Sequence, residues 1–212
     1  MDCCQCRGIE VFFDKKTADK ELKRYRKKGP AKTTRILIAA LKAEGIEGMT
    51  LLDIGGGVGV IQQELLGAGV SSATSVEASA AYVEVSKEDA ERQGYADRVS
   101  YHHANFTDVA PTVADADIVT LDRVICCYHD AQTLVGLSAA RARHLYGAVY
   151  PQYGWFNKVF VSGVNLAFRL RRCAMRSFLY NPDMIDAIVR GHGLQQRFCR
   201  KSFPWQIVVY SR

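Results

Sequence analysis

The chain has 212 residues, of which 48% are apolar and 24% charged, and its formal net charge is +6 at pH 7. These values are ordinary for a soluble protein and allow one α/β domain with a full core. No apolar run approaches the roughly 20 residues that a membrane-spanning helix needs. The first six residues lack the basic and then apolar order of a signal peptide. We therefore expect a single cytoplasmic domain without a membrane span.

Seven cysteines are an odd number at irregular spacing, which argues against a complete disulfide framework. Because a secretory signal is missing, we expect reduced thiols. Cys3, Cys4 and Cys6 contain one C-x-x-C pair that can supply two or three metal ligands, but a structural zinc site normally has a second pair. A packed or flexible tail is the alternative, and we predict no metal.

Positive charge is concentrated near the N-terminus. The cations there are Lys15, Lys16, Lys20, Lys23, Arg24, Arg26, Lys27, Lys28, Lys32 and Arg35. A solvated helix face explains such a row, and so does a surface that attracts a nucleic acid or an anionic small molecule. Neither aromatic interleaving nor a known nucleic-acid module accompanies the row, so nucleic acid is an unfavoured partner.

Helical and extended patterns alternate along the chain. In chain order we expect helices at 14–28 and around 36–41, then strand 50–54, helix 58–66, strand 73–76, helix 80–93, strand 99–103, strand 117–121, helix 130–144, strand 145–149, a helix opened by Asn181-Pro182-Asp183, and strands 194–201 and 205–210. This alternation implies crossover connections and a parallel sheet. Phe203-Pro204 separates the last two strands, which we expect to pair antiparallel.

Residues 155–178 do not fit the alternation. They are apolar and basic and contain no acid, and we expect a helix there that is broken at Ser162-Gly163. An insertion after the fifth strand would lie over the carboxyl ends of the strands, where open α/β sheets hold their ligands. The segment is therefore predicted to cover the substrate. A surface helix that exposes its arginines is the alternative.

A glycine-rich turn follows the first expected strand. The sequence from Asp53 to Gly59 is D-x-G-x-G-x-G. Glycine permits the positive φ of a tight turn and a close approach of the backbone to a ligand. A dinucleotide fingerprint would need a glycine at position 60, which is Val60. The spacing therefore argues against a pyrophosphate cradle.

This motif resembles motif I of the class I S-adenosylmethionine-dependent methyltransferases, and the resemblance extends over about residues 30–210. It implies an α/β fold with a doubly wound, mostly parallel, seven-stranded Rossmann-like sheet of strand order 3-2-1-4-5-7-6. It also implies S-adenosyl-L-methionine as cofactor and S-adenosyl-L-homocysteine as product. Within one domain we expect N-terminal helices that can act as a lid at 1–49, a donor-binding core at 50–150, a basic cover inserted after strand five at 151–180, and the last helix and strand pair at 181–212.

The residues expected to bind the donor lie at the ends of successive strands. They are Asp53, Gly55, Gly56, Gly57, Glu77, Ala78, Asn105, Phe106 and Asp122, with Tyr25 from the N-terminal helix. Glu77 can accept hydrogen bonds from both ribose hydroxyls. Asn105 stands where the family usually has an acid, and its amide oxygen can still accept from the adenine amino group.

The loop after the fourth strand resembles, more weakly, that of magnesium protoporphyrin IX O-methyltransferases, whose pattern is roughly D-V-L-I-H-Y-P-D. This chain has Asp122-Arg123-Val124-Ile125-Cys126-Cys127-Tyr128-His129-Asp130. Cys127 replaces the histidine and His129 replaces the proline. The stretch Tyr180-Asn181-Pro182-Asp183-Met184 also looks like the late helix start of that family.

Methyl transfer is an in-line displacement, so placing the donor and the acceptor is the main task. A hydroxyl acceptor also needs a general base, for which we predict His129, next to Tyr128, with Asp122, His102 and His103 in reserve. The predicted substrate-binding residues are Arg123, His103, Trp155, Arg169 and Arg172.

The sequence thus predicts transfer of a methyl group to a small molecule, mainly an anionic thiolate, sulfide or carboxylate and less so a hydroxyl. Two alternatives remain. One is an RNA methyltransferase that uses the basic N-terminal region. The other is a protein that binds S-adenosylmethionine without catalysis.

Overall fold

A seven-stranded sheet in the order β3-β2-β1-β4-β5-β7-β6 forms the centre of the molecule, which confirms the predicted fold class. The computed structural model describes residues 8, 10, 12–171 and 173–212. The strands are β1 (Thr50–Ile54), β2 (Ser72–Glu77), β3 (Val99–His103), β4 (Ala116–Asp122), β5 (Ala142–Pro151), β6 (Gln195–Ser202) and β7 (Trp205–Ser211). β6 and β7 pair antiparallel, as the sequence predicts, and β7 is also antiparallel to its other neighbour, β5.

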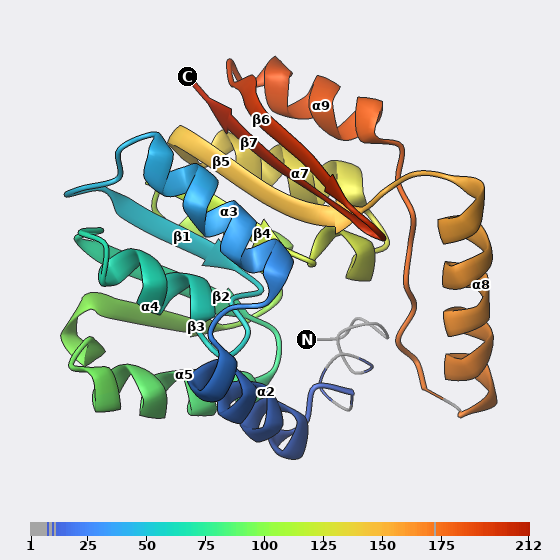
Figure 1. Ribbon diagram of the computed structural model, residues 1–212, viewed down its shortest axis with the longest axis horizontal. Helices are drawn as coiled ribbons and strands as arrows, with labels where there is room; N and C mark the ends of the chain where they lie inside the picture. The colour runs from blue at the N-terminus through green and yellow to red at the C-terminus, as the bar shows by residue number, and fades with distance from the viewer. Residues whose placement is uncertain (1–7, 9, 11, 172) are drawn as a thin grey trace.

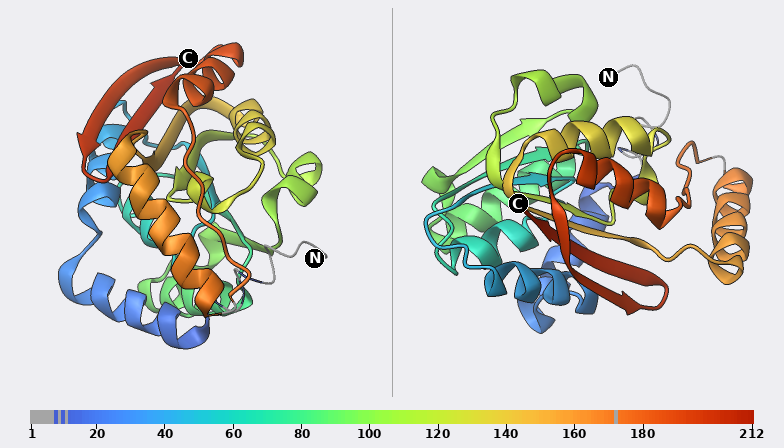
Figure 2. Two further views of the ribbon diagram at one scale, coloured as in Figure 1. Left: turned by 90° about the vertical axis from the view of Figure 1, so that its right-hand side faces the viewer. Right: turned by 90° about the horizontal axis from the view of Figure 1, so that it is seen from above.

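Helices cover both faces of the sheet (Figures 1 and 2). The α-helices are α2 (Lys15–Lys28), α3 (Lys32–Ala43), α4 (Val60–Leu66), α5 (Ala80–Gln93), α6 (Phe106–Val109), α7 (Ala131–Ala140), α8 (Trp155–Leu170) and α9 (Pro182–Gly191). Of these, α8 stands beside the sheet rather than on one of its faces. On one face Leu37 and Leu41 of α3 pack with Leu65 of α4. On the other face Leu134 of α7 packs with Val189 of α9. On each face of the sheet, the apolar sides of the helices are buried against the strands. This burial supplies most of the hydrophobic stabilisation.

The carboxyl ends of the parallel strands meet at one edge of the sheet. Asp53 of β1 lies beside Thr120 of β4, and Glu77 of β2 lies beside His103 of β3. The strand order reverses between β1 and β4, and such a switch point opens a crevice for ligands. α8 stands at the same edge, and the arrow of β5 points towards it in Figure 1. The fold therefore gathers the predicted site residues of four strands in one place.

Two local expectations differ from the structure. α8 is continuous through Ser162 and Gly163, because both lie on its solvent side, where the missing side chain of a glycine leaves no packing defect. α7 ends at Ala140 rather than at residue 144. The chain then turns, and Ala142 pairs with Ala116 of β4. Residues 142–144, which were predicted to be helical, therefore belong to β5.

Candidate methyl-donor and acceptor site

The glycine loop, residues 55–59, faces the crevice, and its glycines leave the backbone uncovered by side chains. Gly55, Gly57 and Gly59 have φ values of 64°, 57° and 82°, which side chains rarely adopt. A Cβ atom on Gly55 would lie 2.5 Å from Cγ2 of Val124. Glycine is therefore required at Gly55 by both the backbone conformation and the space, and the loop can approach a ligand closely.

Asp53 lies beneath this loop and is 1% exposed. Its carboxylate accepts hydrogen bonds from the hydroxyl of Thr120 at 2.7 Å and from the amide of Gln62 at 3.1 Å. Burial raises the pKa of Asp53 to about 7. Asp53 also lines the smaller of two cavities described below, so it supports the loop from below and reaches the edge of the predicted donor site.

Glu77 connects the end of β2 to the glycine loop. One carboxylate oxygen accepts from the backbone N–H of Gly57 at 3.0 Å, and the other accepts from the N–H of Ser79 at 2.9 Å. Burial raises the pKa of Glu77, although these N–H groups work in the opposite direction. A carboxylate has about four lone-pair sites, so two remain for a ligand. Glu77 lines the larger cavity, as a ribose-binding acid would.

Asn105 lies after β3 in a polar cluster at the wall of the larger cavity. Its Nδ2 donates to Thr107, to Asp108 at 3.1 Å and to the hydroxyl of Tyr128 at 3.2 Å. These bonds orient the amide through its nitrogen, and the oxygen is the atom that can accept from an adenine amino group. Phe106, which is 4% exposed, and Ala78 line the same cavity.

Two cavities meet at the end of β4. The smaller, of about 70 Å³, lies between the glycine loop, α2 and α3. The larger, of about 390 Å³, extends from β2 and β3 towards α8, a size within the range of small-molecule sites. Both are lined by Glu21, Gly55, Gly57, Asp122 and Arg123. A ligand that occupied both cavities would pass these shared residues.

The strained residue of the site is Arg123, whose φ of 63° is unusual for a residue with a side chain. Its guanidinium pairs with Asp122 at 3.1 Å. Burial alone would lower the pKa of Arg123, but the Asp122 carboxylate raises it. Asp122 also accepts from the hydroxyl of Thr34 in α3. Two elements thus fix this pair where the two cavities meet.

The far end of the larger cavity is apolar and rich in sulfur and aromatic rings. Its lining residues there are Val124, Cys126, Cys127, Tyr128, Leu134, Val164, Phe168, Met175, Ser177 and Trp205. The two adjacent thiols lie with their sulfur atoms 3.8 Å apart. Cys126 and Cys127 therefore lie along the cavity wall, and part of the cover segment, from Val164 to Ser177, also lines the cavity.

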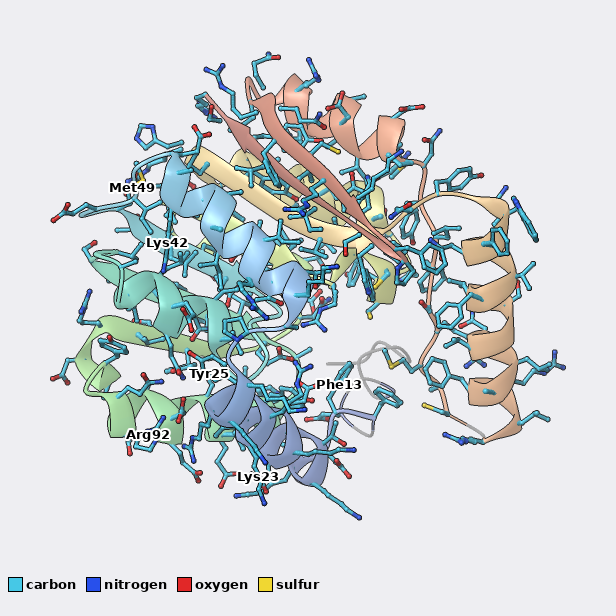
Figure 3. The ribbon with its side chains drawn as sticks, in the orientation of Figure 1. Phe13, Lys23, Tyr25, Lys42, Met49 and Arg92 are labelled. Atoms are coloured by element: carbon cyan, nitrogen blue, oxygen red, sulfur yellow. The ribbon has the colours of Figure 1, made fainter. Side chains whose placement is uncertain are left out.

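Residues before α2 complete the wall, and the sequence interpretation missed them. Figure 3 labels Phe13, which precedes α2 and lines the larger cavity. The hydroxyl of Ser79 donates to the Phe13 carbonyl at 2.7 Å, and the Phe12 ring meets the Phe168 ring of α8 edge-on at 5.4 Å. In the sequence, the adjacent Phe12 and Phe13 ahead of a polar helix were the signal that could have indicated this contact.

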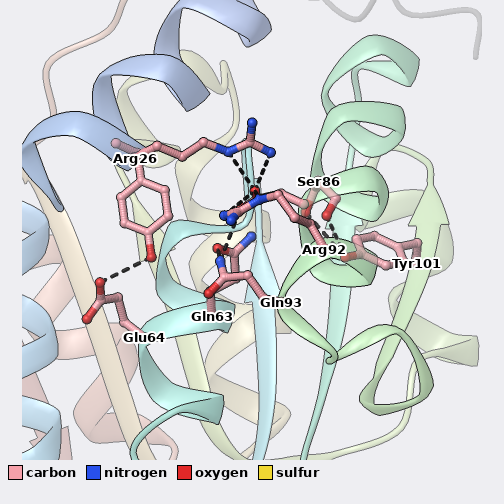
Figure 4. A network of polar contacts seen from close by, with 9 residues as sticks. Arg26, Gln63, Glu64, Ser86, Arg92, Gln93 and Tyr101 are labelled. Carbon is pink, nitrogen blue, oxygen red and sulfur yellow. Dashed lines mark hydrogen bonds and ion pairs between the residues drawn. The ribbon is translucent and has the colours of Figure 1, made fainter.

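α2 is held against the core by a polar network (Figure 4). Arg26 donates to Asp89 of α5, which is fully buried, and Tyr25 donates to Glu64 of α4 at 3.1 Å. Burial raises the pKa of Tyr25 beyond its usual range, so its hydroxyl stays protonated. Tyr25 lines the smaller cavity, where its predicted contact with the donor would lie.

Several predicted site residues lie outside the lining of both cavities. Trp155 is 67% exposed and stacks on Phe156, because the inner face of α8 carries Asn157 instead. Arg169 is exposed. His103 approaches Glu10 at 3.5 Å, and the His129 ring lies tilted beside the Tyr128 ring with the centroids 5.2 Å apart. Exposed His102 also lies outside both linings.

Three further expectations concern Arg172 and the N-terminal cysteines, metal binding, and membrane spans. Arg172, Cys3, Cys4 and Cys6 lie outside the described residues. Among residues 8, 10, 12–171 and 173–212, no group of three metal-ligating side chains comes together. Within the same residues, no helix has the length and apolar character needed to cross a membrane.

Comparison with known proteins agrees with this geometry. The family model described as a methyltransferase domain matches residues 52–140, the stretch that contains the glycine loop, Glu77, Asn105 and Asp122. No curated protein matches the chain in sequence. The methyltransferase domain implies S-adenosylmethionine as the cofactor.

Solved structures show the same fold at low sequence identity. Magnesium protoporphyrin IX methyltransferase from Synechocystis PCC 6803, with bound SAH, has a TM-score of 0.74 and 16% identity over 96% of this chain and 98% of its own. An O-methyltransferase family protein from Burkholderia thailandensis has a TM-score of 0.70 and 15% identity over 96% of this chain and 62% of its own. A putative sarcosine dimethylglycine methyltransferase from Galdieria sulphuraria has a TM-score of 0.67 and 12% identity over 84% of each chain.

Proposed function

We propose that this S-adenosylmethionine-dependent methyltransferase acts on a small molecule whose nucleophile is already ionised, a thiolate, sulfide or carboxylate in preference to a hydroxyl. The observation that carries the proposal is the composition of the larger cavity at its α8 end. That end is apolar and aromatic, and the described lining residues of the cavity include neither histidine nor lysine.

The donor is proposed to lie along the carboxyl ends of β1, β2 and β3. S-adenosylmethionine supplies a methyl group on a sulfonium, which is ready for in-line displacement. Glu77, with two backbone N–H groups already bound, has lone pairs left for the ribose hydroxyls, and the amide of Asn105 is oriented for the adenine. The shared residues between the cavities would then hold the methionine part.

The acceptor is proposed to enter the α8 end of the cavity. Together with a bound acceptor, the apolar walls from Phe168, Met175 and Trp205 are proposed to exclude water, which would strengthen electrostatic contacts with the reacting atoms. Arg123 is the cation among the described lining residues, so it is the proposed partner of an anionic group. A thiolate or a carboxylate needs no proton removed before attack, which suits a wall without an imidazole.

For a hydroxyl acceptor, the proposed general base remains His129. Its ring lies tilted beside that of Tyr128, whose hydroxyl contacts Thr107 at 2.5 Å at the cavity wall. His129→Ala should slow a phenol acceptor at least about tenfold and leave a thiolate or carboxylate nearly unaffected. Tyr128→Phe and Asp122→Asn are the companion variants, since both residues line the cavity. An equal loss with every acceptor would contradict a role as base.

The test of the proposed substrate class is a labelled-methyl assay with a panel of thiols, porphyrin carboxylates, phenols and RNA, read by mass spectrometry. We expect methylated products from one of the first two classes. Transfer confined to phenols, or to RNA, would refute the preference for an ionised small molecule.

The RNA alternative depends on the exposed lysines of α2. Two of the α2 cations are engaged internally, because Lys15 pairs with Glu84 and Arg26 with Asp89. Exposed Lys16, Lys20 and Lys27 on α2 have the charge for phosphate contacts. RNA binding that falls steeply with added salt would favour this alternative, because phosphate contacts release counterions.

A further inference from the structure

α8 presents a broad apolar face to solvent, which is uncommon for a helix of a single compact domain. Its exposed large side chains, each more than half exposed, are Trp155, Phe156, Val159, Phe160, Leu166 and Leu170. They recur at helical spacing on the side opposite Val164 and Phe168, which face the cavity. Asn157 is the buried residue of the helix. The proposed function uses the inner face and leaves the outer face without a role.

Positive charge borders this apolar face. Lys158 and Arg169 lie along one edge of the helix, and exposed Arg171 follows its end. The ammonium of Lys158 lies 4.6 Å from the ring centre of Tyr153, which is itself 48% exposed. From residue 151 to residue 182 the sequence contains no aspartate or glutamate. The outer surface of the segment therefore combines aromatic and aliphatic groups with cations alone.

A neighbouring turn adds a further exposed ring. The backbone N–H of Gln152 donates to the Pro204 carbonyl at 2.8 Å, and the Asn157 amide donates to the same carbonyl at 3.0 Å. These bonds tie the β6–β7 turn to the start of α8. Phe203 in this turn is 74% exposed, and Arg200 and Lys201 of β6 are also exposed. Figure 2 shows α8 lying at the surface of the molecule.

We propose that α8, with Tyr153 and Phe203, docks on the surface of an anionic phospholipid bilayer. Trp, Phe and Leu on one face with Lys and Arg beside them are the composition of helices that lie in the plane of the membrane interface. The aromatic rings insert at the level of the headgroups while the cations meet lipid phosphates. A second copy of the chain fits less well, because a two-fold interface of this face would bring Lys158 and Arg169 close to the same cations of the partner.

The test is flotation of the full chain with vesicles of phosphatidylcholine, alone or mixed with phosphatidylglycerol. We expect binding to the mixed vesicles that is at least about tenfold stronger than to phosphatidylcholine alone and that weakens with salt. The chain has two tryptophans, so Trp205→Phe leaves Trp155 as the reporter. Its emission should shift to the blue with anionic vesicles. Absence of binding would overturn the proposal.

Paired variants separate this surface from net charge. Phe156→Ser with Phe160→Ser should weaken binding about tenfold or more, and Lys158→Gln with Arg169→Gln should weaken it several-fold. Lys16→Gln with Lys27→Gln removes the same charge from exposed positions of α2 and should have little effect. An equal loss with both charge pairs would refute the assignment to α8.

Light scattering without vesicles completes the test, and circular dichroism checks that every variant is folded. We expect the wild-type chain to scatter as a monomer. A dimer that the phenylalanine pair dissociates would show that copies of the chain cover this face, and would also overturn the proposal.

Discussion

The two halves of the site are held by the fold to very different degrees. At the strand ends, Asp53, Glu77 and Asn105 are at most 8% exposed, and each makes two or more hydrogen bonds. In α8, by contrast, one residue of sixteen is buried. The proposed donor half is therefore preorganised by the sheet, while the proposed acceptor half depends on a helix with few contacts.

This contrast teaches where substitutions should act. A preorganised site loses affinity when a single ligand contact is removed, because its geometry does not adjust. A loosely held cover can change without disturbing the sheet. Changes at the strand ends should therefore affect the donor, and changes on the inner face of α8 should affect the acceptor.

The largest expected effect is that of Glu77→Ala on donor binding. Loss of the carboxylate removes the two proposed ribose contacts and the bond to the Gly57 N–H, so affinity should fall about tenfold or more. Calorimetric titration with S-adenosylmethionine measures it. Glu84→Ala is the control, because Glu84 is an exposed residue of α5. Unchanged affinity in Glu77→Ala would remove the ribose assignment and with it the contrast between the halves.

Gly55→Ala should have the next largest effect. The new methyl group would meet Val124, and a φ of 64° costs roughly 1–2 kcal/mol for a residue with a Cβ. We expect a lower melting temperature and weaker donor binding. Gly136→Ala in α7 is the matched control, since its Cβ would meet only Ile188 at an ordinary 3.9 Å. Equal behaviour of the two variants would contradict the role of the loop.

Phe168→Ala should act on the acceptor. The ring lines the α8 end of the larger cavity, so the KM for the acceptor should rise about threefold to tenfold, with the donor affinity unchanged. Phe160→Ala on the outer face of the same helix is the control and should leave both constants as they are. A weaker donor affinity in Phe168→Ala would show that the halves are coupled.

The last expected effect concerns the pH dependence of stability rather than ligand binding. The pKa of Asp53 is about 7 in the folded chain against 3.8 for a free side chain. The folded state therefore keeps the proton that the unfolded state has lost, and stability falls as the pH rises from about 4 to 7. Asp53→Asn should flatten this fall by roughly 1–3 kcal/mol. If the free energy of unfolding changed with pH by the same amount in the variant and the wild type between pH 4 and 8, the raised pKa of Asp53 would be contradicted.

Much of the donor half could be predicted from the sequence. The glycine spacing and the acids at the carboxyl ends of β1, β2 and β4 are local signals, and the sheet brings them together because parallel strands end at one edge. β1, β3 and α5 have the predicted bounds. The exchange of an acid for Asn105 was visible, but its bonds to Thr107 and Tyr128 depend on the fold.

The acceptor half was harder to predict, because the rotation of α8 about its axis is set by tertiary contacts. Trp155 was expected at the substrate, yet two bonds from Asn157 to the Gln152 and Pro204 carbonyls turn that side of the helix inward. Trp155 consequently faces solvent. Trp205 and Phe13 reach the cavity from the far ends of the chain. The Phe12-Phe13 pair was a local signal, whereas no local pattern connects Trp205 with the cavity.

The most direct test of the account is ultraviolet crosslinking of labelled S-adenosylmethionine to the wild-type chain, with the labelled peptides mapped by mass spectrometry. We predict label on peptides that contain residues 77–82 or 105–106, at the ends of β2 and β3. Label confined to residues 155–178 would contradict the claim that the strand ends bind the donor.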